Sequence, residues 1–130
     1  MNLLAHAHLG SIYDRKVNCV NILWDFLARD LRDDKRDFVI SGGKLHNRID
    51  SLTDSSDEFK KSKRLVSTEK RKIAGIIIDI GFDYVLSQNW NIYSTTSLDS
   101  FIDEVLFDLF EYAPELCKKA EIVQEYTETE

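Results

Sequence analysis

The sequence predicts an all-α, single-domain bundle of about six to seven helices. The chain has 130 residues, the usual length of one domain, and 43% of them are apolar, which is enough for one core. It contains only five glycines and one proline, whereas strand-and-turn architectures need these residues at their corners. Apolar residues recur instead at the three- and four-residue spacings of helices.

The first half of the chain predicts three helices. Residues 3–12 indicate a first helix or an irregular helical turn, with His6 and His8 near its start. Residues 17–31 predict a second helix with apolar residues at helical spacing that should face the core: Val20, Leu23, Trp24, Leu27 and Leu31. A third helix is expected over 37–52. Gly42 and Gly43 predict a bend or close packing there, because glycine costs about 1 kcal/mol relative to alanine within a helix.

The second half predicts three longer helices and one short one. Cap-type residues over 53–57 should start a fourth helix. A fifth is expected over 68–90, and its apolar pattern is the one most typical of burial in this chain: Ile73, Ile76, Ile77, Ile80, Val85 and Leu86. An amphipathic helix over 97–112 follows, and Pro114 should start a last short helix. We expect one helical domain over residues 1–125 and an acidic, frayed tail over 126–130.

Charge and cysteine content restrict the partners and the compartment. The net charge is −6, but residues 1–72 carry 15 Lys and Arg against 11 Asp and Glu, whereas residues 73–130 carry 2 against 12. The basic half could meet an acidic protein or a phosphate, or its charges could be ordinary solvated faces. The start of the chain lacks a secretory pattern, and the longest apolar stretch, 73–85, is too short and too charged to span a membrane. Cys19 and Cys117 are expected as reduced thiols in a cytoplasmic protein, with a disulfide as the alternative.

Histidines and aspartates recur on helical segments that are otherwise apolar. His46 and Asp50 are four residues apart and should share a helix face, as should Asp79 and Asp83. Buried carboxylates are costly unless they are paired or bind a cation. The candidates for one interior site are His6, Asp25, His46, Asp50, Asp79 and Asp83.

Mixed histidine and carboxylate ligands suit Mn²⁺, Fe²⁺, Zn²⁺ or Mg²⁺. Such a metal can lower the pKa of bound water and stabilise charge on a phosphoryl oxygen. The alternative is a set of caps and ion pairs, with Asp50 paired to Arg48 and Asp25 to Arg29.

Four segments, in order, resemble the acyl carrier protein phosphodiesterase family up to about Phe101. The family opens with MNFLAHLHL, and this chain with MNLLAHAHLG. Family GNLLADF corresponds to VNILWDF here, and a stretch like GIxxHRxIDxxTD corresponds to GKLHNRIDSLTD at 43–54. Finally, RRxAxIxxDxxxDHFLxxxW corresponds to RKIAGIIIDIGFDYVLSQNW at 71–90.

The resemblance implies a helical fold distantly similar to that of the HD-type metal phosphohydrolases. It also implies hydrolysis of the phosphodiester that links 4′-phosphopantetheine to a serine of holo acyl carrier protein. The expected cofactor is a divalent metal, Mn²⁺ first, with Fe²⁺ or Mg²⁺ as options. The motif positions that carry over are Asn2, His6, Asp25, His46, Arg48, Asp50, Asp54, Asp79 and Asp83.

From these positions we expect metal ligands among the six candidates named above. Catalytic roles are expected for Asp25, His46, Asp50, Asp79 and Asp83, with Arg48 or Arg71 neutralising the phosphate.

Two departures from the family pattern leave other functions open. Tyr84 stands where the family has a histidine, and family members continue well beyond the point where this chain stops. An apolar face left uncovered would favour a homodimer. The alternatives are a catalytically decayed member that binds or inhibits a protein, of a kind that a phage or mobile element could encode, and a hydrolase of another phosphodiester such as a nucleotide.

A basic stretch over 60–72 is a candidate docking surface for the acidic acyl carrier protein. Its candidate residues are Lys60, Lys61, Lys63, Arg64 and Arg71. The acidic remainder of the chain and the lack of a known nucleic-acid-binding motif argue against nucleic acid as the partner.

Overall fold

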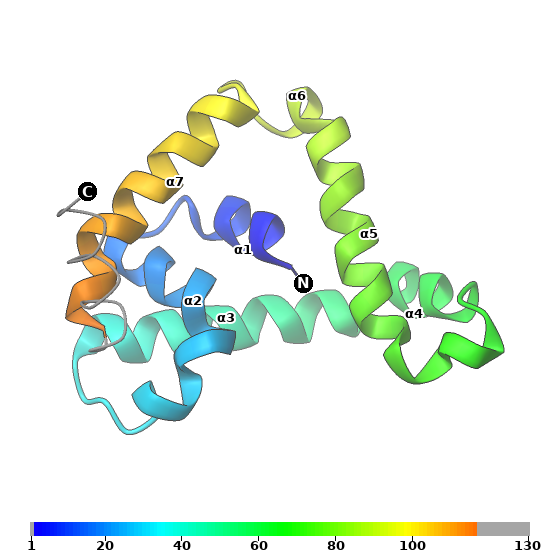
Figure 1. Ribbon diagram of the computed structural model, residues 1–130, viewed down its shortest axis with the longest axis horizontal. Coiled ribbons are helices and arrows are strands. Elements are labelled where there is room, and N and C mark those ends of the chain that lie inside the picture. The colour runs from blue at the N-terminus through cyan, green and yellow to red at the C-terminus, as the bar shows by residue number, and fades with distance from the viewer. Residues whose placement is uncertain (1, 117–130) are drawn as a thin grey trace, which may run out of the picture.

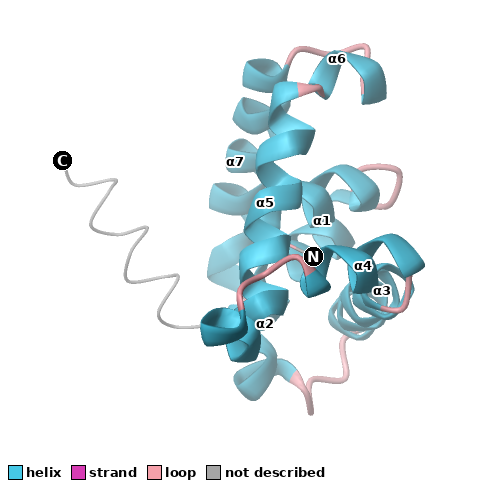
Figure 2. Ribbon diagram, turned by 90° about the vertical axis from the view of Figure 1, so that its right-hand side faces the viewer, coloured by secondary structure: helices cyan, strands magenta, loops and turns pink. Residues whose placement is uncertain are grey.

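The computed structural model describes residues 2–116, which form helices joined by short loops (Figure 2). This confirms the all-α, single-domain class for the described part of the chain; the expected tail at 126–130 and Cys117 lie outside it. The α-helices are α1 (Leu3–Gly10), α2 (Arg15–Leu31), α3 (Asp37–Asp54), α4 (Asp57–Arg64), α5 (Ala74–Gln88), α6 (Trp90–Tyr93) and α7 (Leu98–Tyr112). Two 3₁₀ turns, η1 (Thr68–Ile73) and η2 (Ala113–Glu115), precede α5 and follow α7.

Several helices begin where a side chain caps the first turn. Asp14 accepts hydrogen bonds from the backbone N–H groups of Lys16 and Val17, so α2 begins at Arg15 rather than at Val17. Ser56 caps α4 in the same way, which confirms that the cap-type segment 53–57 starts a helix. Ser97 caps α7.

The helices α2 and α3 pack closely and form the centre of the fold. The apolar face expected on α2 is confirmed, since Val20 and Leu31 are buried and Trp24 packs beside them. The helix α3 is continuous through Gly42 and Gly43, so the glycine pair is explained by close packing rather than by a bend. A Cβ at Gly42 would lie 2.5 Å from Val20 Cγ1, and one at Gly43 would lie 2.7 Å from a Trp24 ring carbon.

A second core cluster joins the N-terminal helix to the later helices. Ala7, Ile22, Trp90 and Phe101 are its buried members, contributed by α1, α2, α6 and α7. The Trp90 indole also donates a hydrogen bond to the Thr96 carbonyl at 2.8 Å, which fixes the turn before α7. This cluster packs α1 against residues of α2, α6 and α7.

The segment 68–90 differs from its prediction in two respects. It is not one helix but a 3₁₀ turn followed by α5 and α6. The isoleucine face expected to be buried is exposed, with Ile76 at 62% and Ile80 at 56% of full exposure. The reason is that α5 packs mainly against α1, α4 and η1, so the rest of its apolar circumference is left largely uncovered by the described residues. Figure 1 shows α3, α5 and α7 as the three sides of an open triangle, with α1 inside it and α2 crossing α3.

Two further predictions concerned a membrane-spanning helix and the state of the cysteines. No helix within residues 2–116 combines the length and apolar character required to cross a bilayer. Cys19 is a buried free thiol, and its burial, reinforced by the charge of Asp108, raises its pKa to about 12.

Candidate metal centre

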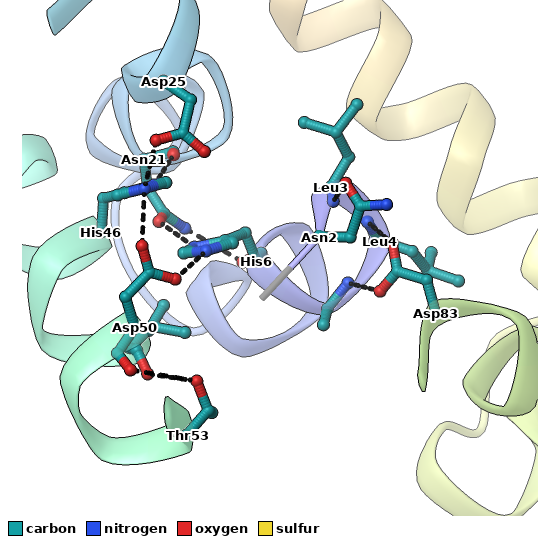
Figure 3. Close-up of polar contacts among 12 residues, drawn as sticks. Asn2, Leu3, Leu4, His6, Asn21, Asp25, His46, Asp50, Thr53 and Asp83 are labelled. Atoms are coloured by element: carbon teal, nitrogen blue, oxygen red, sulfur yellow. Dashed lines mark hydrogen bonds and ion pairs between the residues drawn. The ribbon is translucent and has the colours of Figure 1, made fainter. Parts of the chain in front are cut away.

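Three helices bring two histidines and two aspartates together. His6 comes from α1, Asp25 from α2, and His46 and Asp50 from successive turns of α3, on one face as predicted (Figure 3). Both imidazoles are buried, and their rings stack with centroids 4.1 Å apart and planes 6° from parallel.

The carboxylates converge on the Nε2 atoms of these rings. Asp50 bridges them, since its Oδ1 lies 2.9 Å from His6 Nε2 and its Oδ2 lies 3.1 Å from His46 Nε2. Asp25 Oδ1 lies 3.1 Å from the same His46 atom. The side chains of Asp50 and Asp25 are 32% and 70% exposed, so the centre opens to solvent on its carboxylate side. Asp25 therefore does not occupy the buried face expected from its apolar neighbours.

Asn21 sets the orientation of both rings. His46 Nδ1 lies 2.8 Å from the Asn21 carbonyl oxygen, which can only accept, so this nitrogen carries a proton. The Asn21 amide nitrogen donates to the His6 carbonyl and to the Asn18 side-chain oxygen, both at 3.0 Å. Its Oδ1 is then assigned as the acceptor for His6 Nδ1, at 2.9 Å. Each ring thus has its Nδ1 proton committed and its Nε2 turned toward the carboxylates.

This arrangement fits a cation. In the neutral rings, both Nε2 lone pairs would face carboxylate oxygens, which is unfavourable because both groups only accept hydrogen bonds. Protonating both rings would instead stack two positive charges at 4.1 Å. His46 Nε2 is also buried without a hydrogen bond of acceptable geometry, although two carboxylates are near it.

A divalent ion resolves the conflict, since it uses both lone pairs and neutralises the carboxylates. One donor atom each from His6, His46 and Asp50 lies within 4.8 Å of the others. Imidazole and carboxylate donors together suit Mn²⁺, Fe²⁺ or Zn²⁺.

Two carboxyl groups near the centre have shifted pKa values. Partial burial acts to raise the pKa of Asp50, but hydrogen bonding and nearby positive charge outweigh it and hold the pKa below its usual value. Asp50 is therefore ionised and suited to ligation. Partial burial raises the pKa of Asp79 on α5, and the charges of Asp54 and Asp50 add to the rise. Asp79 thus lies within electrostatic range of the centre.

Other predicted residues lie away from this group. Asp83 on α5 accepts hydrogen bonds from the backbone N–H groups of Leu4 and Ala5, at 2.9 and 3.0 Å, at the start of α1. Arg48 is exposed on α3, two positions from both His46 and Asp50 and hence about 200° around the helix from each.

The remaining motif positions are peripheral to the centre. Arg71 is exposed in η1, and its guanidinium lies 3.4 Å from the Val66 carbonyl oxygen. Asp54 is exposed at the last residue of α3, and Asn2 caps Leu3 at the start of α1. Tyr84, at the position of the expected histidine, is 65% exposed on α5.

The sequence predicted no role for the buried asparagines Asn18 and Asn21. Asn21 is fully buried, and Asn18 extends the same network by donating to the Ala7 carbonyl at 3.2 Å. A signal was present, because Asn18, Asn21 and Asp25 recur at helical spacing on α2 beside its apolar face. Polar residues at such positions need partners, and these partners are the histidine-bearing elements.

Comparison with known proteins gives consistent results. Three curated relatives carry the name acyl carrier protein phosphodiesterase. The protein of Pectobacterium atrosepticum is 36% identical over 104 residues, covering 79% of this chain and 53% of the relative. That of Yersinia enterocolitica is 30% identical over 115 residues, covering 88% and 59%, and that of Photorhabdus laumondii is 35% identical over 103 residues, covering 78% and 52%.

The chain thus spans about half the length of the curated relatives it matches. No solved structure matches it significantly. The sequence model of the acyl carrier protein phosphodiesterases matches residues 1–130. By this match over its whole length, the chain belongs to the acyl carrier protein phosphodiesterase family.

Proposed function

We propose that this chain is a metal-dependent phosphodiesterase that releases 4′-phosphopantetheine from holo acyl carrier protein. One observation carries the metal dependence: two buried histidines have their Nδ1 protons committed and both Nε2 atoms turned toward carboxylates. The names of the relatives support the substrate.

His6, His46 and Asp50 would hold the metal, with Asp25 on the solvent side. When bound, the metal supplies a water of lowered pKa and stabilises charge on a phosphoryl oxygen. Two imidazole donors favour Mn²⁺ or Fe²⁺ over Mg²⁺, which prefers oxygen ligands. Asn21 keeps both rings oriented, and the exposed Asp25 carboxylate would accept a proton from the attacking water.

The reaction is a simple displacement at phosphorus. The water oxygen bonds to phosphorus, and the bond from phosphorus to the serine oxygen breaks. The serine oxygen takes up a proton. The products are apo carrier protein and free 4′-phosphopantetheine.

The carrier would dock on the basic surface of α4 and η1. Lys60, Lys61, Arg64 and Arg71 are exposed there, while the Lys63 ammonium lies 5.2 Å from the centre of the Phe59 ring. The helix α4 begins three residues after α3 ends, so this surface adjoins the helix that carries His46 and Asp50. Clustered cations favour a strongly acidic partner.

The position of Tyr84 favours the enzyme over a decayed binding module. Its side chain is 65% exposed on α5, whereas the centre is built from α1, α2 and α3. A substitution at this position therefore leaves every member of the His6–His46–Asp50 group in place.

The test is mass spectrometry of holo acyl carrier protein incubated with the chain and Mn²⁺. Loss of the prosthetic group, prevented by a chelator, supports the proposal; an unchanged carrier with a folded chain refutes it and favours a binding module. A panel of other phosphodiesters distinguishes a different substrate.

Two matched pairs of variants separate chemistry from docking. Asp50→Asn should abolish release, whereas Asp30→Asn, which neutralises an exposed aspartate on α2, should not affect it. Charge reversal by Lys60→Glu should raise KM with little change in kcat, whereas Lys35→Glu, remote in sequence from the basic surface, should change neither.

A further inference from the structure

The helix α1 cannot hold its own position. It has eight residues, and isolated helices shorter than about 12–15 residues are marginal in water because nucleation is costly. Its placement must come from other elements. At its C-terminal end, Gly10 packs against α2 so closely that a Cβ would lie 2.6 Å from the Asn21 amide nitrogen. A different helix holds the N-terminal end.

Asp83 on α5 caps the start of α1 (Figure 3). Its Oδ2 accepts from the Leu4 N–H at 2.9 Å, and its Oδ1 accepts from the Ala5 N–H at 3.0 Å. The first N–H groups of a helix lack partners within it and are normally satisfied by a local cap. Here the local cap residue, Asn2, bonds the Leu3 N–H at 3.0 Å. Asp83, 79 positions from Leu4, completes the cap.

The contact is also electrostatically favourable. A carboxylate at a helix N-terminus interacts with the positive end of the helix dipole, and hydrogen bonds to a charged acceptor are stronger than neutral ones. Asp83 is half-buried, so water screens this interaction less than it would at the surface. Both of its oxygens are engaged by backbone donors of α1.

The cap lies directly beside the candidate metal centre along the chain. Ala5, which donates to Asp83, immediately precedes His6. The His6 N–H closes the first turn on the Asn2 carbonyl at 3.1 Å, and its ring lies 2.9 Å from Asp50. A displacement of this turn by about 1 Å would stretch the ring contact beyond hydrogen-bond range.

We propose that Asp83 is a positioning residue, which caps α1 from α5 and thereby fixes His6 within the metal centre. The inference rests on the proposed function in one respect, because it takes the centre to bind a metal. In this arrangement α5 supports His6, the one histidine of the centre that lies on α1.

The test compares Asp83→Ala and Asp83→Asn with a control, Asp103→Ala, which removes an exposed carboxylate from α7. In metal-free protein, Asp83→Ala should accelerate amide hydrogen exchange at Leu4 and Ala5 and shift the His6 imidazole nitrogen resonances. Its Mn²⁺ affinity should fall on the order of tenfold, as for other residues that support metal ligands. Asp83→Asn keeps one acceptor oxygen and should be intermediate, and the control should match the parent protein.

Unchanged His6 resonances with unchanged Mn²⁺ affinity in a folded Asp83→Ala protein would overturn the proposal. An equal loss of affinity in the control would also overturn it. Should the alanine variant not fold, Asp83→Asn decides by the same two measurements. If the parent protein binds no Mn²⁺, the proposed function fails, but the metal-free His6 resonances still decide the positioning role.

Discussion

Substituting Gly42 by alanine should weaken both the fold and the metal centre. The added Cβ would lie 2.5 Å from Val20 Cγ1 and 2.8 Å from the backbone oxygen of Val17, whereas carbon contacts are normally about 3.5–4.0 Å. Because the Val17 atom belongs to the backbone, a rotamer change cannot relieve the clash. The helices α2 and α3 must separate locally by about 1 Å.

Two opposing terms determine the magnitude. Overpacking of this kind costs about 1–3 kcal/mol, and alanine regains about 1 kcal/mol over glycine inside a helix. We therefore expect a net loss of up to about 2 kcal/mol, or up to roughly 8 °C in Tm for a domain of this size.

The same separation reaches the metal centre. His46 lies one turn after Gly42 on α3 and bonds the Asn21 carbonyl on α2 at 2.8 Å, a contact that an added 1 Å would break. Mn²⁺ affinity should therefore fall about 10–100-fold.

Urea denaturation and calorimetric Mn²⁺ titration measure the two effects. The matched control is Gly81→Ala on α5, where a Cβ would meet no atom within 4 Å. Here only the helix propensity changes, so stability should rise by about 0.5–1 kcal/mol and affinity should stay constant. If Gly42→Ala is as stable as Gly81→Ala and binds Mn²⁺ equally well, the close approach of α2 and α3 is not as described.

Three further predictions address single groups. Asn21→Ala removes the acceptor for His6 Nδ1 and should weaken Mn²⁺ binding about 10–100-fold, as measured by calorimetry. An unchanged Mn²⁺ affinity would count against the role of Asn21 in orienting the His6 ring. Burial, with the nearby charge of Asp108, raises the pKa of Cys19 to about 12, so mass spectrometry should find it alkylated by iodoacetamide only in unfolded protein. Burial also raises the pKa of Asp79, so its ionisation costs stability above the unfolded pKa of about 3.9 and not below it. Asp79→Asn should therefore be more stable than the parent in urea at neutral pH, with the difference vanishing in acid.

Helical periodicity and capping predicted the parts of the fold in which local and tertiary preferences agree. The core face of α2 was predicted because its apolar residues occupy one side of the helix. The burial of α5 was not predictable in the same way. Its apolar residues surround the helix, so their pattern gives no direction, and burial depends on which elements pack there.

The centre was predictable to the extent that its residues share helix faces. The four-residue spacing of His46 and Asp50 indicated that they act together, and they do meet at 3.1 Å. The role of Asn21 rests partly on its backbone carbonyl, which carries no sequence signal. The Asp83 cap joins positions 79 residues apart, and a single sequence does not reveal such a pairing.

The side chains of the centre all come from helices that end by Asp54. Contacts between neighbouring helices cost little loop-closure entropy, so Asp25, His46 and Asp50 on α2 and α3 can come together before α5 reaches the start of α1. Variation after α3 removes none of the four side chains of this group, although a change at Asp83 removes the cap on α1.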